Sequence, residues 1–220
     1  MKLYATLAAS ALLSFPAYGA VVLSTTFTNL QGTSDNESNL VISDNTGSTI
    51  AANTGFVAIG TFNSSNAAIA SLSTPAALDS AFKQFGASTT MGAFGGSFSA
   101  QATLDPDTLF DGVNTFTGSS VYIVVGNSST LALSTEFLVW DSGVLFANTD
   151  PSGSPDEVIL DVGSGSLVIG LDNKHTFDLS IVPGGSATQA AFTAVELVPE
   201  PSSTALLGLG GVALLLRRRR

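Results

Sequence analysis

The sequence predicts a mainly β protein whose body is β-sandwich-like or a related two-layer β domain. From Val21 onward, short β-branched and aromatic runs alternate with clusters of Gly, Asn, Asp and Ser, which is the pattern of successive strands and turns. Hydrophobic residues make up 45% of the chain and charged residues only 11%, so it can build a core. Because cysteine is absent, that core must be stabilised by packing alone.

The first nineteen residues predict a secretory signal peptide, which forms an N-terminal signal helix. Lys2 supplies the positive start, residues 3–15 the apolar stretch, and residues 17–19 a small-x-small cleavage site. A buried first helix is the alternative, but Pro16 would break it and a β-like run follows at once. Residues 20–197 are therefore expected to form a secreted β-rich domain.

Ten strands are expected in this domain, bounded by residues that favour turns. They span residues 21–27, 40–43, 56–62, 97–102, 121–125, 136–140, 158–161, 166–169, 176–181 and 191–196. Explicit turns are expected at residues 141–143, 171–174 and 183–185.

One short amphipathic helix is expected to interrupt the strands. Thr74 is a suitable N-cap, Pro75 occupies the first helical position, and Gly86 follows the last turn. The helical spacing predicts one apolar stripe, made of Leu78, Ala81, Phe82 and Phe85.

The charge of the central segment excludes one class of partner. Residues 21–198 hold sixteen acidic side chains against Lys83 and Lys174, which gives a net charge of −14. Such a surface repels phosphate backbones and anionic lipid headgroups, so no nucleic acid is expected as a partner.

The inventory for catalysis is thin, and the chain is predicted not to be an enzyme. His175 is the single histidine, and it lies between Asp172 and Asp178 in what looks like a turn entering a strand. A Ser-His-Asp set is compatible with this composition, but no GxSxG nucleophile elbow is present. A surface histidine is the simpler interpretation.

Two acidic segments could in principle hold a cation or form a carboxylate pair. The first contains Asp105, Asp107 and Asp111, and the second contains Asp150, Asp156 and Glu157. Both are rich in Pro and Gly, so solvated loops are expected and no cofactor is predicted, although calcium stays open for the first segment.

Trp140, the single tryptophan, could serve as a platform for a sugar ring or as a core residue. One tryptophan is weak support for a sugar-binding face, so a buried or half-buried Trp140 is expected. The same reasoning places four phenylalanines in the core: Phe56, Phe62, Phe98 and Phe137.

The chain ends in a segment of three parts, residues 198–220. A Pro-Glu-Pro run, formed by Pro199, Glu200 and Pro201, is followed by thirteen mainly apolar residues, 204–216. As a helix these would reach about 20 Å, short of the ~30 Å hydrocarbon core, so a weak and temporary membrane helix is expected. A terminal cluster then keeps the end cytoplasmic: Arg217, Arg218, Arg219 and Arg220.

This order of parts resembles the PEP-CTERM sorting signal of exopolysaccharide-producing Gram-negative bacteria. The resemblance covers about 23 of 220 residues. It implies recognition by an exosortase, removal of the tail, and delivery to the cell surface or extracellular matrix. An ordinary C-terminal membrane anchor is the alternative interpretation.

These inferences predict a secreted non-catalytic surface or matrix protein with a structural or adhesive role. Its expected partners are the Sec translocon, the inner membrane as a transient anchor, the exosortase and an exopolysaccharide. The alternative is an envelope protein that binds or modifies polysaccharide. The two differ in whether Trp140, His175 and the acidic residues meet in one concave pocket.

Overall fold

The computed structural model describes residues 23–29, 41–93, 95–147, 157–160, 165–177 and 187–197. These residues form twelve strands and two short helices, so the described part of the chain is mainly β, as predicted. The expected signal peptide, the turn at 183–185 and the C-terminal segment from residue 198 lie outside the described residues.

The strands form three sheets. The largest has the order β12 (Val195–Glu196), β7 (Glu136–Leu145), β6 (Ser120–Gly126), β3 (Phe56–Phe62) and β4 (Phe82–Gln84), with β9 (Ser166–Ile169) also paired to β7. A second sheet has the order β5 (Ser99–Leu104), β1 (Leu23–Thr28) and β8 (Glu157–Ile159). The third has the order β10 (Leu171–Phe177), β11 (Ala187–Thr193) and β2 (Val41–Ser43).

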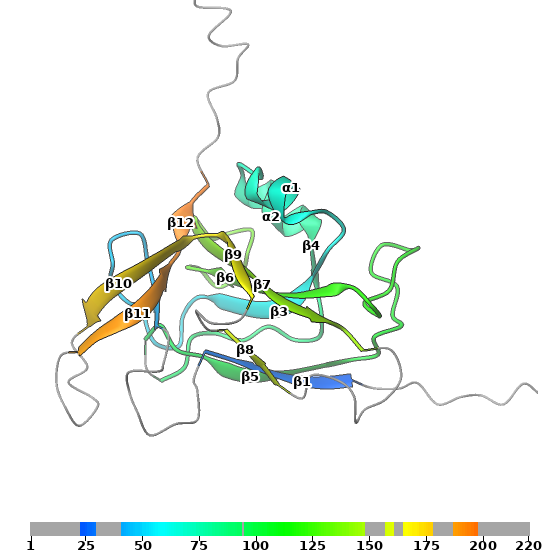
Figure 1. The fold of residues 1–220 in the computed structure, drawn as a ribbon, viewed down its shortest axis with the longest axis horizontal. Coiled ribbons are helices and arrows are strands. Elements are labelled where there is room, and N and C mark those ends of the chain that lie inside the picture. Colours follow the sequence, from blue (N-terminus) through cyan, green and yellow to red (C-terminus); the bar gives the residue numbers. More distant parts are fainter. Residues whose placement is uncertain are drawn as a thin grey trace, which may run out of the picture.

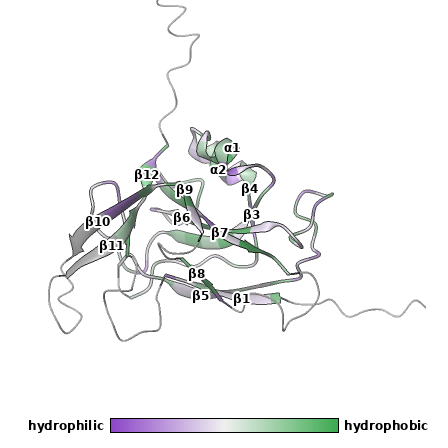
Figure 2. Ribbon diagram, viewed as in Figure 1, coloured by the Kyte–Doolittle hydropathy of each residue, from purple (hydrophilic) through white to green (hydrophobic). Residues whose placement is uncertain are grey.

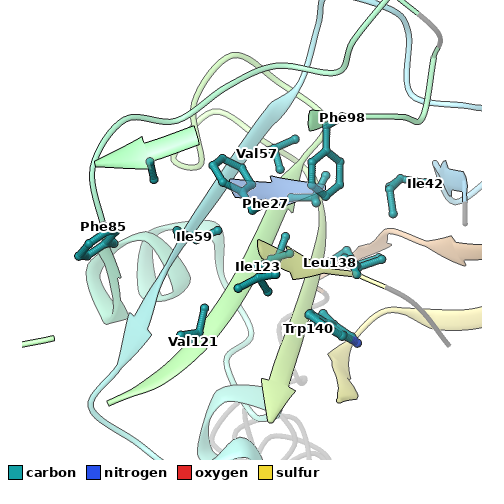
Figure 3. Packing of buried hydrophobic residues seen from close by; sticks show 14 of the residues in the cluster. Phe27, Ile42, Val57, Ile59, Phe85, Phe98, Val121, Ile123, Leu138 and Trp140 are labelled. Atoms are coloured by element: carbon teal, nitrogen blue, oxygen red, sulfur yellow. The ribbon is translucent and has the colours of Figure 1, made fainter. Parts of the chain in front are cut away.

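The central strands of the largest sheet are buried on both faces. Every residue of β3 is buried, and so are six of the seven residues of β6. Side chains alternate between the two faces of a strand, so each strand contributes to two cores. Ile59 and Ile123 point to one side and join Phe27 of β1 (Figure 3), whereas Val124 belongs to a second core cluster.

The molecule is therefore layered. Sheet β5-β1-β8 lies on one side of the largest sheet, and the helices α1 (Asn66–Ala70) and α2 (Pro75–Ala81) lie on the other (Figure 1). Ile69 of α1 and Leu78 of α2 are fully buried against the helix-facing core. The described part of the chain is thus mainly β, as predicted, with three sheets and with two helices over one face of the largest.

The predicted helix begins as expected and ends early. The Thr74 hydroxyl accepts a hydrogen bond from the Ala77 N–H at 3.2 Å, and Pro75 is the first helical residue. However, Phe82 leaves the helix to pair with Phe62 in β3, and Phe85 packs in the opposite core. The expected helical stripe is wrong beyond Ala81, because pairing to the edge of the sheet replaces the last turn. Helix α1, capped by Ser65, was not predicted.

Most predicted strands are confirmed, two of them with identical limits (56–62 and 166–169). The turn predicted at 171–174 is wrong: these residues belong to β10, and the chain turns instead at Gly170, where φ is 129°. Consequently the strand expected at 176–181 begins earlier, at Leu171. Strand β10 is hydrophilic and lies at a sheet edge, which explains why its polar residues look like a turn (Figure 2).

The turn predicted at 141–143 is also wrong, since β7 continues to Leu145. The register between β6 and β7 shifts between Ser120 and Tyr122, as in a β-bulge. Gly143 has a φ of 72°, and the Ser142 hydroxyl donates to the Val121 carbonyl at 2.7 Å. Turn-forming residues therefore mark an irregularity inside a long strand.

Candidate functional site

The final described residues lead directly into the predicted sorting segment. Strand β12 forms two residue pairs with β7, Val195 with Phe137 and Glu196 with Glu136. The residues predicted to carry the sorting signal, Pro199 to Pro201 and Arg217 to Arg220, lie outside the described residues. The structure thus shows the strand that immediately precedes this segment.

Strands β7 and β12 are both hydrogen-bonded to Asn45 in the loop after β2. The backbone N–H of Asn45 donates to Glu136 Oε2 at 3.0 Å, and the Asn45 side-chain amide donates to Glu196 Oε1 at 3.2 Å. One neutral residue therefore bridges two carboxylates that stand opposite each other on neighbouring strands. The sequence gives no local signal for this arrangement, because its three parts are about 60 to 150 residues apart.

The first acidic segment is a structured loop in which each carboxylate has a local partner. Asp105 Oδ1 accepts from the Asp107 N–H at 2.9 Å, and Asp107 Oδ1 accepts from the Thr117 hydroxyl at 2.6 Å. Asp111 accepts from the backbone N–H groups of Val113 and Asn114 and from the Asn114 side chain. These are the contacts of carboxylates that stabilise turns.

The hydrogen bonds to Asp111 lower the pKa of its carboxyl group. Hydrogen bonds from the backbone and side chain of Asn114, and then from the backbone of Val113, lower the pKa of the Asp111 carboxyl. Hydrogen bonds to the charged form favour it, so Asp111 remains an acceptor over the whole neutral range. Within the described residues, no group of three or more His, Asp or Glu side chains is placed to hold a metal ion.

Trp140 and His175, which were considered for sugar binding and catalysis, lie on strands of different sheets, whereas Asp150 and Asp156 lie outside the described residues. Trp140 is only 1% exposed and packs in the core between the two sheets (Figure 3), so the core prediction is confirmed and its ring faces no solvent. His175 lies within β10, opposite Gln189, rather than in the predicted turn. The four phenylalanines predicted for the core are all buried: Phe56, Phe62, Phe98 and Phe137.

A polar network at the helix-covered face was not predicted. The Tyr122 hydroxyl donates to Asn66 Oδ1 at 2.7 Å, and the Asn66 amide donates to Asp141 Oδ2 at 2.8 Å. Burial, and then the Asp141 charge, raise the pKa of Tyr122. Tyr122 therefore stays neutral as a hydrogen-bond donor, and the network fastens α1 to the sheet.

These features describe a β-rich domain whose last described strand, β12, ends at Glu196. Residues 197–220 match the PEP-CTERM protein-sorting motif. The chain therefore carries this sorting signal, which implies exosortase-dependent sorting of an exported protein.

No curated protein and no solved structure is significantly similar to the chain. In the described ranges, no helix is long and apolar enough to cross a membrane. The predicted tail helix at 204–216 lies outside those ranges.

Proposed function

We propose that this chain is a non-catalytic protein of the cell surface or extracellular matrix, with a structural or adhesive role. In this proposal an exosortase sorts and processes it at the C-terminal signal. The observation that carries the proposal is the match of residues 197–220, which begins one residue after the last strand of the domain. Export by a signal peptide and a transient inner-membrane anchor at residues 204–216 complete the route.

The state of the candidate chemical groups supports a non-catalytic role. Asp105, Asp107 and Asp111 bond to their own loop, and Trp140 is enclosed in the core. An aromatic sugar platform needs a face that a substrate can reach, and the ring of Trp140 has none. Asp107 and Asp111 are exposed, but their carboxylate oxygens already accept hydrogen bonds from their own loop.

The sorting part is tested by replacing Pro199, Glu200 and Pro201 with alanine in the native host. The expected variant is exported and inserted like wild type, because the apolar segment is unchanged, but it keeps its tail. Wild type should lose residues 217–220. Cell fractionation and intact-mass analysis of the product measure both outcomes.

A matched variant changes the other end of the signal. Replacing Arg217, Arg218, Arg219 and Arg220 with serine should let unprocessed protein leak outward, since an arginine costs at least ~2.5 kcal/mol at the bilayer centre and a serine far less. Normal tail loss in the Pro-Glu-Pro variant, or retention of the four arginines by wild type at its final location, would contradict the proposal.

One observation favours polysaccharide binding as a second candidate function. The outer face of sheet β5-β1-β8 places Ser24 opposite Thr103 and Thr26 opposite Gln101, with Ser99 beside them. Ser24, Ser99, Gln101 and Thr103 are exposed. Hydroxyl and amide groups on this strand pair can exchange hydrogen bonds with the hydroxyls of a neutral glycan. One carboxylate, that of the exposed Glu157 opposite Thr26, lies on the edge strand β8 beside them.

This second candidate predicts a specific loss of binding. Gln101→Glu with Thr103→Glu places two carboxylates on the face and should weaken co-sedimentation with exopolysaccharide from the native host. The matched control is Ser129→Glu with Ala132→Glu, at two exposed positions between β6 and β7. Equal binding by wild type and both variants would exclude this face as the glycan surface.

A further inference from the structure

The sorting motif leaves the domain with almost no spacer, and this has a consequence for its processing. Strand β12 ends at Glu196, and the motif match begins at Leu197. Pro199 is three residues beyond the paired strand, so it lies at most about 11 Å from the sheet edge along an extended chain. An enzyme that binds Pro199–Pro201 must therefore approach the surface of the folded domain closely.

The backbone just before the motif is paired with strand β7. Val195 and Glu196 pair with Phe137 and Glu136 of β7, and the side chains of Val195 and Leu197 pack against the helix-facing core. An enzyme cleft that holds an extended substrate needs free N–H and C=O groups on that substrate. The groups of β12 that face β7 cannot bond to such a cleft at the same time, and the side chains of Val195 and Leu197 are held against the core.

Strand β12 is also the weakest paired element of the largest sheet. It forms two residue pairs, whereas β6 and β7 share six. Its Glu196 stands directly opposite Glu136, and like charges in this position are destabilising. Asn45 offsets this by donating to both carboxylates. Sheet-edge elements with few residue pairs open at low free-energy cost.

We propose that β12 is a latch that must detach from β7 before the C-terminal signal can be processed, and that the Asn45 contacts with Glu136 and Glu196 set how readily it opens. Detachment frees residues 195–197 and lengthens the accessible segment by about 10 Å. The next fixed point is Ala194, a buried residue whose N–H donates to the Ser43 carbonyl at 2.8 Å. This proposal rests on the proposed exosortase processing.

A disulfide across the latch tests the proposal in the full-length chain. Directly opposite residues of antiparallel strands have Cα separations of about 4.5–5.5 Å, within the range that a disulfide spans. Glu136→Cys with Glu196→Cys should therefore staple β12 to β7, and the chain has no other cysteine to interfere. The matched control is Glu136→Ser with Glu196→Ser, which removes the same two charges without a cross-link.

In the native host, the stapled chain should lose its tail at least about tenfold more slowly than the serine pair. Intact mass reports both the disulfide and the tail. Equal rates in a chain whose disulfide has formed overturn the latch. The Pro-Glu-Pro alanine variant is run in parallel: if it is processed normally, exosortase recognition itself fails, whereas if it keeps its tail and the staple has no effect, only the latch fails.

Two further measurements on the purified protein test the latch without relying on processing in cells. A non-specific protease added to the purified full-length chain should cut near residues 195–201 more slowly when the staple is present, and dithiothreitol should remove the difference. Asn45→Ala removes the amide that bonds to Glu196 and should speed that cleavage about threefold. Unchanged cleavage by both variants, with Trp140 emission showing a folded domain, also overturns the latch.

Discussion

Replacing Phe116 with alanine is expected to destabilise the domain by about 3–5 kcal/mol, a large part of the 5–15 kcal/mol that holds a typical domain together. Phe116 is 2% exposed and lies in the loop between β5 and β6. Its ring packs edge-on against Phe85 at a centroid distance of 5.1 Å and against Phe146 at 5.5 Å. Truncation removes these contacts and leaves a cavity that the surrounding strands cannot close.

The matched control is Phe110→Ala in the same loop. Phe110 is only partly buried, and its ring contacts Phe116 at 5.0 Å. The Phe110→Ala change should cost about 1–1.5 kcal/mol, because part of the Phe110 side chain is already exposed to water. Urea unfolding followed by emission of the buried Trp140 measures both variants. Equal costs, or a cost below 1 kcal/mol for Phe116, would show that this loop does not contribute to the core.

This aromatic cluster shows how far sequence reasoning reaches. Short β-branched and aromatic runs bounded by turn-forming residues identified most strands, since strand propensity and turn chemistry are local properties of the chain. The register that brings the 105–119 loop against Phe85 and Phe146 depends on contacts between distant segments. Phe85 was assigned to a helical stripe because its spacing from Leu78 fits a helix, and only the pairing of Phe62 with Phe82 overrides that spacing.

The candidate functional features also divide into those formed by contiguous residues, which the sequence predicts, and those formed by distant residues, which it does not. The order of proline, glutamate, an apolar run and arginines is contiguous, so the sequence alone identified the sorting motif that residues 197–220 match. The contact of Asn45 with Glu136 and Glu196 is not contiguous and could not be predicted. In the same way, polar residues of β10 and of the bulge in β7 look like turns, because edge strands and bulges use the residues that turns use.

A buried asparagine joins β1 to the loop that precedes β5, and its replacement should be comparably damaging. The Asn29 amide donates to the Gly96 carbonyl at 2.8 Å, and Asn29 Oδ1 accepts from the Phe98 N–H at 2.7 Å. Asn29 is fully buried. Asn29→Ala leaves the Phe98 N–H without this acceptor, which costs about 1–3 kcal/mol, and removes one of two hydrogen bonds to the Gly96 carbonyl, which still accepts from the Ile42 N–H at 2.9 Å. A loss of about 2–4 kcal/mol in the free energy of unfolding is therefore expected.

Asn29→Asp separates the hydrogen bonds from the shape of the side chain. A protonated carboxyl can donate to Gly96 and accept from Phe98, as Asn29 does, so the variant should approach wild type near pH 4. Burial raises the pKa of the new carboxyl above its value of about 3.9 in the unfolded chain. The unfolded state then releases its proton first as pH rises, and stability relative to wild type should fall by up to about 1.4 kcal/mol per pH unit until the folded-state pKa is reached. Urea titrations of both proteins at pH 4, 5.5 and 7, followed by Trp140 emission, measure this difference. A difference that does not change with pH would show that residue 29 is hydrated in the folded protein and that its two hydrogen bonds do not hold the loop to β1.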